Sequence, residues 1–387
     1  MHYNYNTDTR SFYIHWPFCP YKCHFCPFVA FANQDHLMTR YHEALLAEIG
    51  LFANSCRQAG KKLDLETIYF GGGTPSTYPT HLLLDTLCIL KNEFNLKADA
   101  EITIEVNPGT VSQEQLRVWK TIGINRLSIG VQSLNDAVLK KLNRHQSAQD
   151  VVRVLDMAKN FFDNVSVDFI VGLPGVSDVD WKEMIETAVT WPISHISVYF
   201  LTVHEHTALY FRVKQKIVEL PCDDLVVDLY HWTRDRLVMS NFEQYEISSF
   251  ARVGYESRHN RVYWNRKPFK GFGVGAWSFD GISRFENEKN LVTYLKLIEE
   301  KQDIVAVGEQ LSDEQIYIEK IMLGLRQIKG VLLTEMEIGL SESRRDSLRE
   351  TIEILKKEGF IVARDGRIAI TPMGLSVENS IARRLSL

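Results

Sequence analysis

The first half of the chain alternates short apolar runs with longer amphipathic segments. Short runs rich in Ile, Val, Tyr and Phe have the composition of β-strands, at residues 12–15, 67–70, 101–105, 126–129, 165–169 and 196–200. Segments with apolar residues at helical spacing lie at 36–56, 81–94, 112–122, 135–142, 148–162 and 178–190. Six strands that alternate with helices predict βαβ units, and therefore a parallel sheet with right-handed crossovers.

Two α/β architectures are compatible with this alternation. An open doubly wound sheet and a partial TIM-like barrel share the same order of elements, and periodicity does not distinguish them. In both architectures the ligands bind at the carboxyl ends of the strands. Most polar motifs in this half of the chain follow strand ends, so the sequence predicts a site at that edge of the sheet.

The pattern changes after residue 200. A helix is predicted at 223–240 and a strand at 245–250, followed by a loop rich in Arg, His, Asn, Tyr and Trp. Three glycines within 269–279 indicate a tight turn or a closely approached backbone. Helices at 313–327 and 343–358, a hairpin with Asp365-Gly366 at its turn, and a last helix at 373–384 predict a winged-helix-like α+β cap. We therefore divide the chain into a core (1–205), an extension packed on the core (206–310) and a C-terminal domain (311–387).

Composition excludes several classes of function. The net charge of −5 gives no general attraction to nucleic acid or to anionic membranes, and the helices of the cap mix Glu with Arg and Lys without a basic face. No apolar run reaches about 18 residues, so no spanning helix is expected. The first residues lack the basic start and apolar stretch of a secretory signal. We expect a protein of the cytoplasm, either free or peripheral at a membrane.

Three of the six cysteines form a compact motif directly after the first predicted strand. The run Cys19-Pro-Tyr-Lys-Cys23-His-Phe-Cys26 could wrap one iron–sulfur cluster from a single loop, with one iron left open to another ligand. The alternative is a structural zinc site with His24 as the fourth ligand, although zinc sites usually gather ligands in two separated pairs. A third interpretation is plain structural thiols. Cys56, Cys88 and Cys222 belong to no motif.

The other strand ends carry candidate binding residues. Gly71, Gly72 and Gly73, followed by Thr74, could bring backbone N–H groups close to an anion, or could form an ordinary turn. Glu105 ends the third strand, where it could bind a ribose hydroxyl or an ammonium group, or act as a helix cap.

Three further polar residues belong to the later βα units. Gln132 follows the fourth strand, and the fork of Arg144 suits a carboxylate unless Arg144 forms a surface ion pair. Asp168 lies inside an apolar strand, so it needs either a ligand or a partner in the core.

The cysteine spacing is the signature of the radical S-adenosylmethionine (radical SAM) superfamily, and the rest of this half of the chain resembles that family too. The resemblance implies a parallel (β/α)6 partial TIM-like barrel. It also implies a [4Fe-4S] cluster on Cys19, Cys23 and Cys26, whose open iron is chelated by S-adenosylmethionine. In that family, one-electron reduction then releases a 5′-deoxyadenosyl radical.

Further motifs resemble the oxygen-independent coproporphyrinogen III oxidase family, and most closely its heme-chaperone, HemW-like branch. They include Tyr13-Ile-His-Trp-Pro-Phe-Cys19, Ile68-Tyr-Phe-Gly-Gly-Gly-Thr-Pro75, Asp168-Phe-Ile-Val-Gly-Leu-Pro174 and Ser257-Arg-His-Asn260. By this resemblance, nine residues occupy positions that contact S-adenosylmethionine: Tyr13, Phe25, Gly72, Gly73, Thr74, Glu105, Gln132, Arg144 and Asp168.

The resemblance favours a heme chaperone that passes heme to an acceptor protein, which we expect to be a membrane respiratory protein. A reductant such as flavodoxin or ferredoxin would serve the cluster. The alternative is a coproporphyrinogen III oxidase, which decarboxylates propionates in porphyrin biosynthesis. The oxidases carry a further Cys where this chain has Phe28, so we predict that oxidase activity is absent. Trp277 stands where many chaperone-type members have His, and His259 is the preferred candidate for a heme ligand, its alternative being a loop histidine bonded to backbone.

Overall fold

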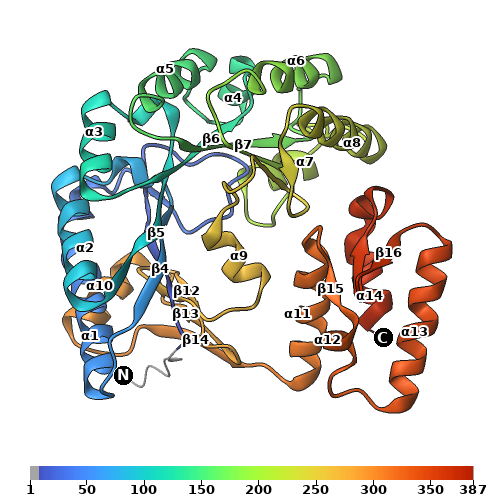
Figure 1. The fold of residues 1–387 in the computed structure, drawn as a ribbon. Helices are drawn as coiled ribbons and strands as arrows, with labels where there is room; N and C mark the ends of the chain where they lie inside the picture. The colour runs from blue at the N-terminus through green and yellow to red at the C-terminus, as the bar shows by residue number, and fades with distance from the viewer. Residues whose placement is uncertain (1–7, 387) are drawn as a thin grey trace.

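Six parallel strands, in chain order, form the centre of the main sheet (Figure 1). The computed structural model describes residues 8–386. The six strands are β1 (Ser11–Trp16), β4 (Asp64–Gly72), β5 (Asn95–Val106), β6 (Arg126–Gln132), β7 (Asn164–Val171) and β8 (His195–Phe200). Each neighbouring pair is parallel. The predicted strands and the parallel α/β class are confirmed.

Helices connect these strands and lie along the outer side of the sheet (Figure 1). They are α1 (Met38–Gln58), α2 (Thr80–Glu93), α3 (Gln113–Ile122), α4 (Asp136–Lys141), α5 (Ala148–Ala158) and α6 (Asp178–Ala188). Ser112, Ser147 and Ser177 start α3, α5 and α6 with reciprocal capping boxes, which explains why the predicted starts agree with the structure. The helices predicted at 148–162 and 178–190 end earlier, at Ala158 and Ala188.

The sheet continues beyond the six predicted strands at both edges. β11 (Lys270–Phe272) adds in parallel to β1, while β10 (Ser249–Ala251) and β9 (Glu243–Gln244) add antiparallel beyond β8. The prediction of one strand at 245–250 is therefore wrong, because the chain turns between β9 and β10. Two short strands, β2 (Phe18–Cys19) and β3 (Phe31–Ala32), pair at either end of the cysteine loop.

The segment after β8 contains elements that the sequence pattern only partly predicted. Its helices are α7 (Ala208–Lys214), α8 (Asp223–Met239), α9 (Arg258–Trp264) and α10 (Leu291–Glu299). A three-stranded sheet of β12 (Trp277–Phe279), β13 (Ser283–Asn287) and β14 (Val305–Gln310) was not predicted. Gly271 lies in a closely approached backbone, as expected, because a Cβ there would lie 2.1 Å from the Trp277 carbonyl oxygen.

The C-terminal residues pack around a second group of buried apolar side chains. The elements are α11 (Asp313–Arg326), β15 (Val331–Leu332), α12 (Leu333–Glu337), α13 (Glu342–Lys357), β16 (Ile361–Arg364), β17 (Arg367–Ile370) and α14 (Glu378–Ser386). Asp365 and Gly366 both have positive φ between β16 and β17, so the predicted hairpin is confirmed. Tyr230 and Ile247 join this group from outside, and the boundaries at 205 and 310 stay predictions. None of the helices between residues 8 and 386 is long and apolar enough to cross a membrane.

Candidate functional site

A cavity of about 470 Å³ lies where the parallel strands end at their carboxyl ends. It brings together eleven of the twelve residues that the sequence singled out: Cys19, Cys23, Phe25, Cys26, Gly72, Gly73, Thr74, Glu105, Gln132, Arg144 and Asp168. Tyr13 is not among the lining residues. These residues come from the carboxyl-terminal parts of β4, β5, β6 and β7, from the cysteine loop and, for Gly73, Thr74 and Arg144, from the segments that follow β4 and α4. The parallel topology therefore gathers residues that lie almost 150 positions apart in the sequence.

The cysteine loop is fixed on both sides by main-chain hydrogen bonds. The His24 N–H donates to the Leu142 carbonyl at 2.9 Å, and the His24 carbonyl accepts from the Leu209 N–H at 2.8 Å. Cys19, Cys23 and Cys26 are free thiols that line the cavity. The loop is thus positioned by α4 and α7 so that its sulfur atoms face the site.

Two donors reach these sulfur atoms. The Thr74 hydroxyl donates to Cys19 Sγ at 3.2 Å, and Arg144 Nη1 donates to Cys23 Sγ at 3.7 Å. Donors of this kind suit thiolates that carry negative charge, as cluster ligands do. The residues present therefore fit an iron–sulfur cluster.

The zinc alternative fits less well. His24 Nδ1 lies 3.1 Å from the Lys141 carbonyl oxygen and 3.0 Å from Arg212 Nη1, so this ring nitrogen is engaged with α4 and α7. In the part of the chain that the structure describes, no group of three or more His, Cys, Asp or Glu side chains is placed to hold one metal ion. A cubane cluster does not require such convergence, because each thiolate binds a different iron atom.

The glycine run does not offer free amides to an anion, contrary to expectation. The N–H groups of Gly72, Gly73 and Thr74 donate to Glu105 Oε2, the Trp16 carbonyl and the Phe18 carbonyl at 3.2, 2.8 and 2.9 Å. A Cβ on Gly73 would lie 2.8 Å from backbone atoms of Pro17 and Phe18. The glycines are required because β4 ends in close contact with the segment after β1, and the amides are already satisfied.

Glu105 is an acid that faces the cavity. Its carboxylate accepts from the Tyr69 hydroxyl at 2.9 Å and from the Gly72 N–H at 3.2 Å. Burial raises the pKa of Glu105 to about 7, although the hydrogen bond from Tyr69 acts in the opposite direction. Glu105 can therefore change its charge near neutral pH, and it lies beside the end of the glycine run.

Asp168 has partners in the protein and also faces the cavity. Its Oδ2 accepts from the Ser128 hydroxyl at 2.9 Å. Burial raises the pKa of Asp168, and hydrogen bonds from Ser197 and Ser128 partly offset that rise. The two interpretations made from the sequence, core pairing and ligand binding, are compatible for this residue.

Arg144 is buried and does not form the surface ion pair considered as its alternative. Its Nε donates to Gln146 Oε1 at 2.8 Å, and its Nη2 donates to the Gly130 carbonyl. Within residues 8–386 no carboxylate lies within ion-pair distance of it. Gln132 adopts a φ of +65° beside it, at the bulge where β6 ends. Arg144 thus presents a positive charge to the cavity, with the Cys23 sulfur rather than a carboxylate as its neighbour.

Tyr13 stacks on Tyr69, which lines the cavity, but does not itself line it. His15 Nε2 is 2.8 Å from the Val29 carbonyl, which can only accept, so Nε2 carries the proton. His15 Nδ1 then accepts from the Tyr13 hydroxyl at 3.1 Å. The hydroxyl of Tyr13 is therefore occupied within the protein.

The inner face of the barrel strands contains polar residues that we did not single out. They recur at alternate positions of the strands: Thr67 and Tyr69, Glu101 and Thr103, Arg126 and Ser128, Ser166, Ser197 and Tyr199. Of these, Tyr69, Ser128 and Tyr199 line the cavity. The signal was available, because a strand buried on both faces normally reads as continuously apolar. Polar residues with a period of two in such strands indicate a polar interior.

His259 is buried rather than held in a loop. It belongs to α9, and its ring nitrogens lie 2.7 Å from the Thr67 hydroxyl and 2.8 Å from the Tyr263 hydroxyl. Burial lowers the pKa of His259 to about 3. Both nitrogens are engaged, so in this conformation neither is available to an iron atom.

The fold and the cysteine site define a radical SAM protein. Residues 13–188 match the family described as the Radical SAM superfamily. The structure is similar to that of coproporphyrinogen III oxidase (HemN) from Escherichia coli, with a TM-score of 0.84 and 22% identity, over 99% of this chain and 91% of that one. At this identity the likeness shows the fold, which is the partial barrel that we predicted.

Sequence relatives define the family more closely. The chain is 31% identical over 374 residues to the heme chaperone HemW of Bacillus subtilis, which covers 96% of this chain and 98% of the relative. It is 33% identical to the HemW of Synechocystis, over 84% of this chain and 79% of the relative. The chain belongs to the HemW family of radical SAM proteins.

Proposed function

We propose that the protein is a heme chaperone of the radical SAM type, which binds heme and transfers it to an acceptor protein. Similarity to proteins named heme chaperone HemW, over nearly the whole chain, is the observation that carries this proposal. The acceptor that we favour is a membrane respiratory protein.

Cys19, Cys23 and Cys26 would hold a [4Fe-4S] cluster, whose chemistry when bound is one-electron transfer to S-adenosylmethionine. The side chains around it would bind S-adenosylmethionine. Arg144 suits its carboxylate and Glu105 its ammonium or ribose groups, because each presents the opposite charge or an acceptor to the cavity. We expect a small acidic reductant such as flavodoxin or ferredoxin to reduce the cluster.

Coproporphyrinogen III oxidation is the second candidate, because the E. coli oxidase shares this fold. Phe28 argues against it. Its side chain lines the cavity and is 63% exposed, and a phenyl ring cannot act as a thiol, a proton donor or a metal ligand. We therefore expect no oxidase activity.

One experiment separates the two functions. The protein is reconstituted anaerobically with iron and sulfide, reduced, given excess S-adenosylmethionine, and supplied in parallel with heme and with coproporphyrinogen III. We expect heme binding at micromolar concentration, on the order of −8 kcal/mol, and no protoporphyrinogen IX. Formation of protoporphyrinogen IX over many turnovers would show that the protein is an oxidase. An absence of heme binding would refute the chaperone function.

A further inference from the structure

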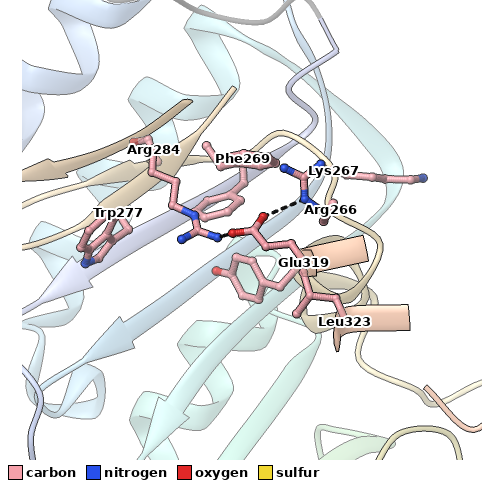
Figure 2. A pocket seen from close by; sticks show the side chains of 10 residues that line it. Arg266, Lys267, Phe269, Trp277, Arg284, Glu319 and Leu323 are labelled. Carbon is pink, nitrogen blue, oxygen red and sulfur yellow. Dashed lines mark hydrogen bonds and ion pairs between the residues drawn. The ribbon is translucent and has the colours of Figure 1, made fainter. Parts of the chain in front are cut away.

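A second pocket, of about 330 Å³, lies among α9, β12, β13 and α11 (Figure 2). Its apolar wall is aromatic: Phe269, Phe279, Trp277 and Tyr263, with Leu323 beside them. It shares no lining residue with the cavity that contains the cysteines. Since 330 Å³ is at the small end for ligand sites, it suits one edge of a larger flat molecule.

Positive charge is concentrated on this aromatic pocket. Arg266, Lys267 and Arg284 line it, against the single carboxylate of Glu319. Figure 2 shows Glu319 between the two guanidinium groups, and Arg266 Nε donates to it at 2.8 Å while Arg284 forms an ion pair with its other oxygen. One carboxylate cannot neutralise three cations, so the pocket carries an excess of positive charge in a protein of net charge −5.

Arg266 has unused hydrogen-bonding capacity here. Its Nη2 is buried and has no hydrogen-bond partner among residues 8–386, while its guanidinium carbon lies 4.9 Å from the centroid of the Phe279 ring. Its backbone adopts a φ of +48°, which non-glycine residues seldom do. A buried guanidinium N–H without an acceptor destabilises the protein unless a ligand or a water molecule accepts its hydrogen bond. An arginine fork of this kind pairs well with a carboxylate.

We infer that this pocket binds the carboxylate-bearing edge of a porphyrin, with the propionates toward Arg266, Arg284 and Lys267 and the ring on Trp277 and Phe269. The inference rests on the proposed heme chaperone function and gives that function a site. Trp277 is 41% exposed, so it offers its face to a ring that extends out of the pocket. None of the ten lining side chains is His, Cys or Met, so the pocket recognises the macrocycle and its carboxylates rather than the metal.

The pocket lies away from the cysteine site along the barrel. The N–H groups of Arg258 and His259, at the start of α9, donate to the buried Glu101 at 3.0 Å each. Glu101 precedes Glu105 by four residues of β5, which corresponds to about 13 Å of extended strand. His259 of α9 stacks on Tyr69, which lines the cysteine cavity, and lies 2.8 Å from the hydroxyl of Tyr263, which lines the pocket, so α9 lies between the two sites.

Titrations of the reconstituted protein test the site, with heme followed by absorbance and metal-free protoporphyrin IX by fluorescence. Arg284→Gln and Trp277→Ala should each weaken the binding of both ligands by about tenfold or more, because the first removes a charged hydrogen-bond donor and the second removes an aromatic contact surface. Both side chains are partly exposed, and thermal melts check that each variant is folded. Arg349→Gln, at an exposed ion pair in the C-terminal domain, is the matched control and should bind both porphyrins as wild type does. Saturating S-adenosylmethionine should leave the heme affinity unchanged.

The outcomes separate the site from the function. If Arg284→Gln and Trp277→Ala bind heme as tightly as the wild type, the pocket is not the porphyrin site, but the proposed chaperone function still stands. Tight binding of heme without any binding of protoporphyrin IX would also rule out the pocket as the porphyrin site, because a protein ligand to iron would then dominate. If the wild-type protein binds neither heme nor protoporphyrin IX, the proposed function itself fails.

Discussion

Replacing Glu105 by Gln should stabilise the metal-free protein at pH 8 and leave its stability almost unchanged below pH 4.5. Gln is nearly isosteric: its carboxamide oxygen can accept from the Gly72 N–H, and its NH2 group can donate to the Tyr69 hydroxyl, so the main difference is the loss of a buried charge. Burial raises the pKa of Glu105 from its ordinary 4.5 to about 7. Between pH 4.5 and pH 7, Glu105 is therefore protonated in the folded state but ionised in the unfolded state. The free energy of unfolding falls as the pH rises through this range.

The size of the effect follows from the pKa. Each pH unit between the two values corresponds to about 1.4 kcal/mol, so the full penalty above pH 7 is about 3 kcal/mol. Glu105→Gln should remove most of it. Urea unfolding at pH 4.5, 5.5, 6.5 and 8 measures the free energy of unfolding directly, and the gain should grow steadily over that range. The same variant should bind S-adenosylmethionine less tightly, because it cannot become negative.

A matched control and a clear contrary result complete the test. Glu353→Gln changes an exposed carboxylate that pairs with Lys356 on α13, so its effect should be small at every pH. A gain from Glu105→Gln of equal size at pH 4.5 and pH 8 would show that packing rather than charge is responsible. A loss of stability at pH 8 would refute the argument that burial dominates the pKa of Glu105.

Three further predictions concern the cluster and its cavity. Reconstituted protein should contain about four irons and four sulfides per chain, and Cys23→Ala should abolish the absorbance of the cluster. Stoichiometric zinc without sulfide would contradict the prediction of an iron–sulfur cluster. Arg144→Ala should weaken the change that S-adenosylmethionine causes in the electron paramagnetic resonance spectrum of the reduced cluster, whereas an equal response in both proteins would remove Arg144 from the site. Gly73→Val should destabilise the metal-free fold by about 3 kcal/mol or more in urea, because its Cβ meets backbone at 2.8 Å; a folded variant that lost only S-adenosylmethionine binding would show that the glycines serve the ligand alone.

The core of the fold was predictable because its signals are local. Each of the six strands contains a segment rich in Ile, Val, Tyr or Phe, and helices such as α3 begin at Ser112 with a capping box that lies within four residues of sequence. The candidate site was predictable for a related reason. Residues such as Glu105 and Asp168 lie at or near strand ends, and parallel topology brings those ends together.

The elements that sequence analysis missed depend on distant partners. α9 has only seven residues, and besides its local cap at Ser257 its first N–H groups are satisfied by Glu101, more than 150 positions earlier. For the same kind of reason, the partners of the amides in the glycine run were not predictable. Gly73 is constrained by Pro17 and Phe18, and only the folded structure brings those backbone atoms against it.

The anchoring of the cysteine loop bears on how freely this sequence can change. Besides the contacts of the His24 ring with Lys141 and Arg212, residue 24 makes two hydrogen bonds, to Leu142 and Leu209, that involve main-chain atoms alone. Every amino acid except proline carries the same N–H and carbonyl groups. A substitution at position 24 therefore keeps these two hydrogen bonds, and the sulfur atoms on either side stay in place. Proline at position 24 or 209 is the substitution that removes a donor. Geometry that depends on the main chain in this way tolerates a change of side chain, which suits a chain that shares about a third of its residues with relatives such as the Bacillus subtilis protein.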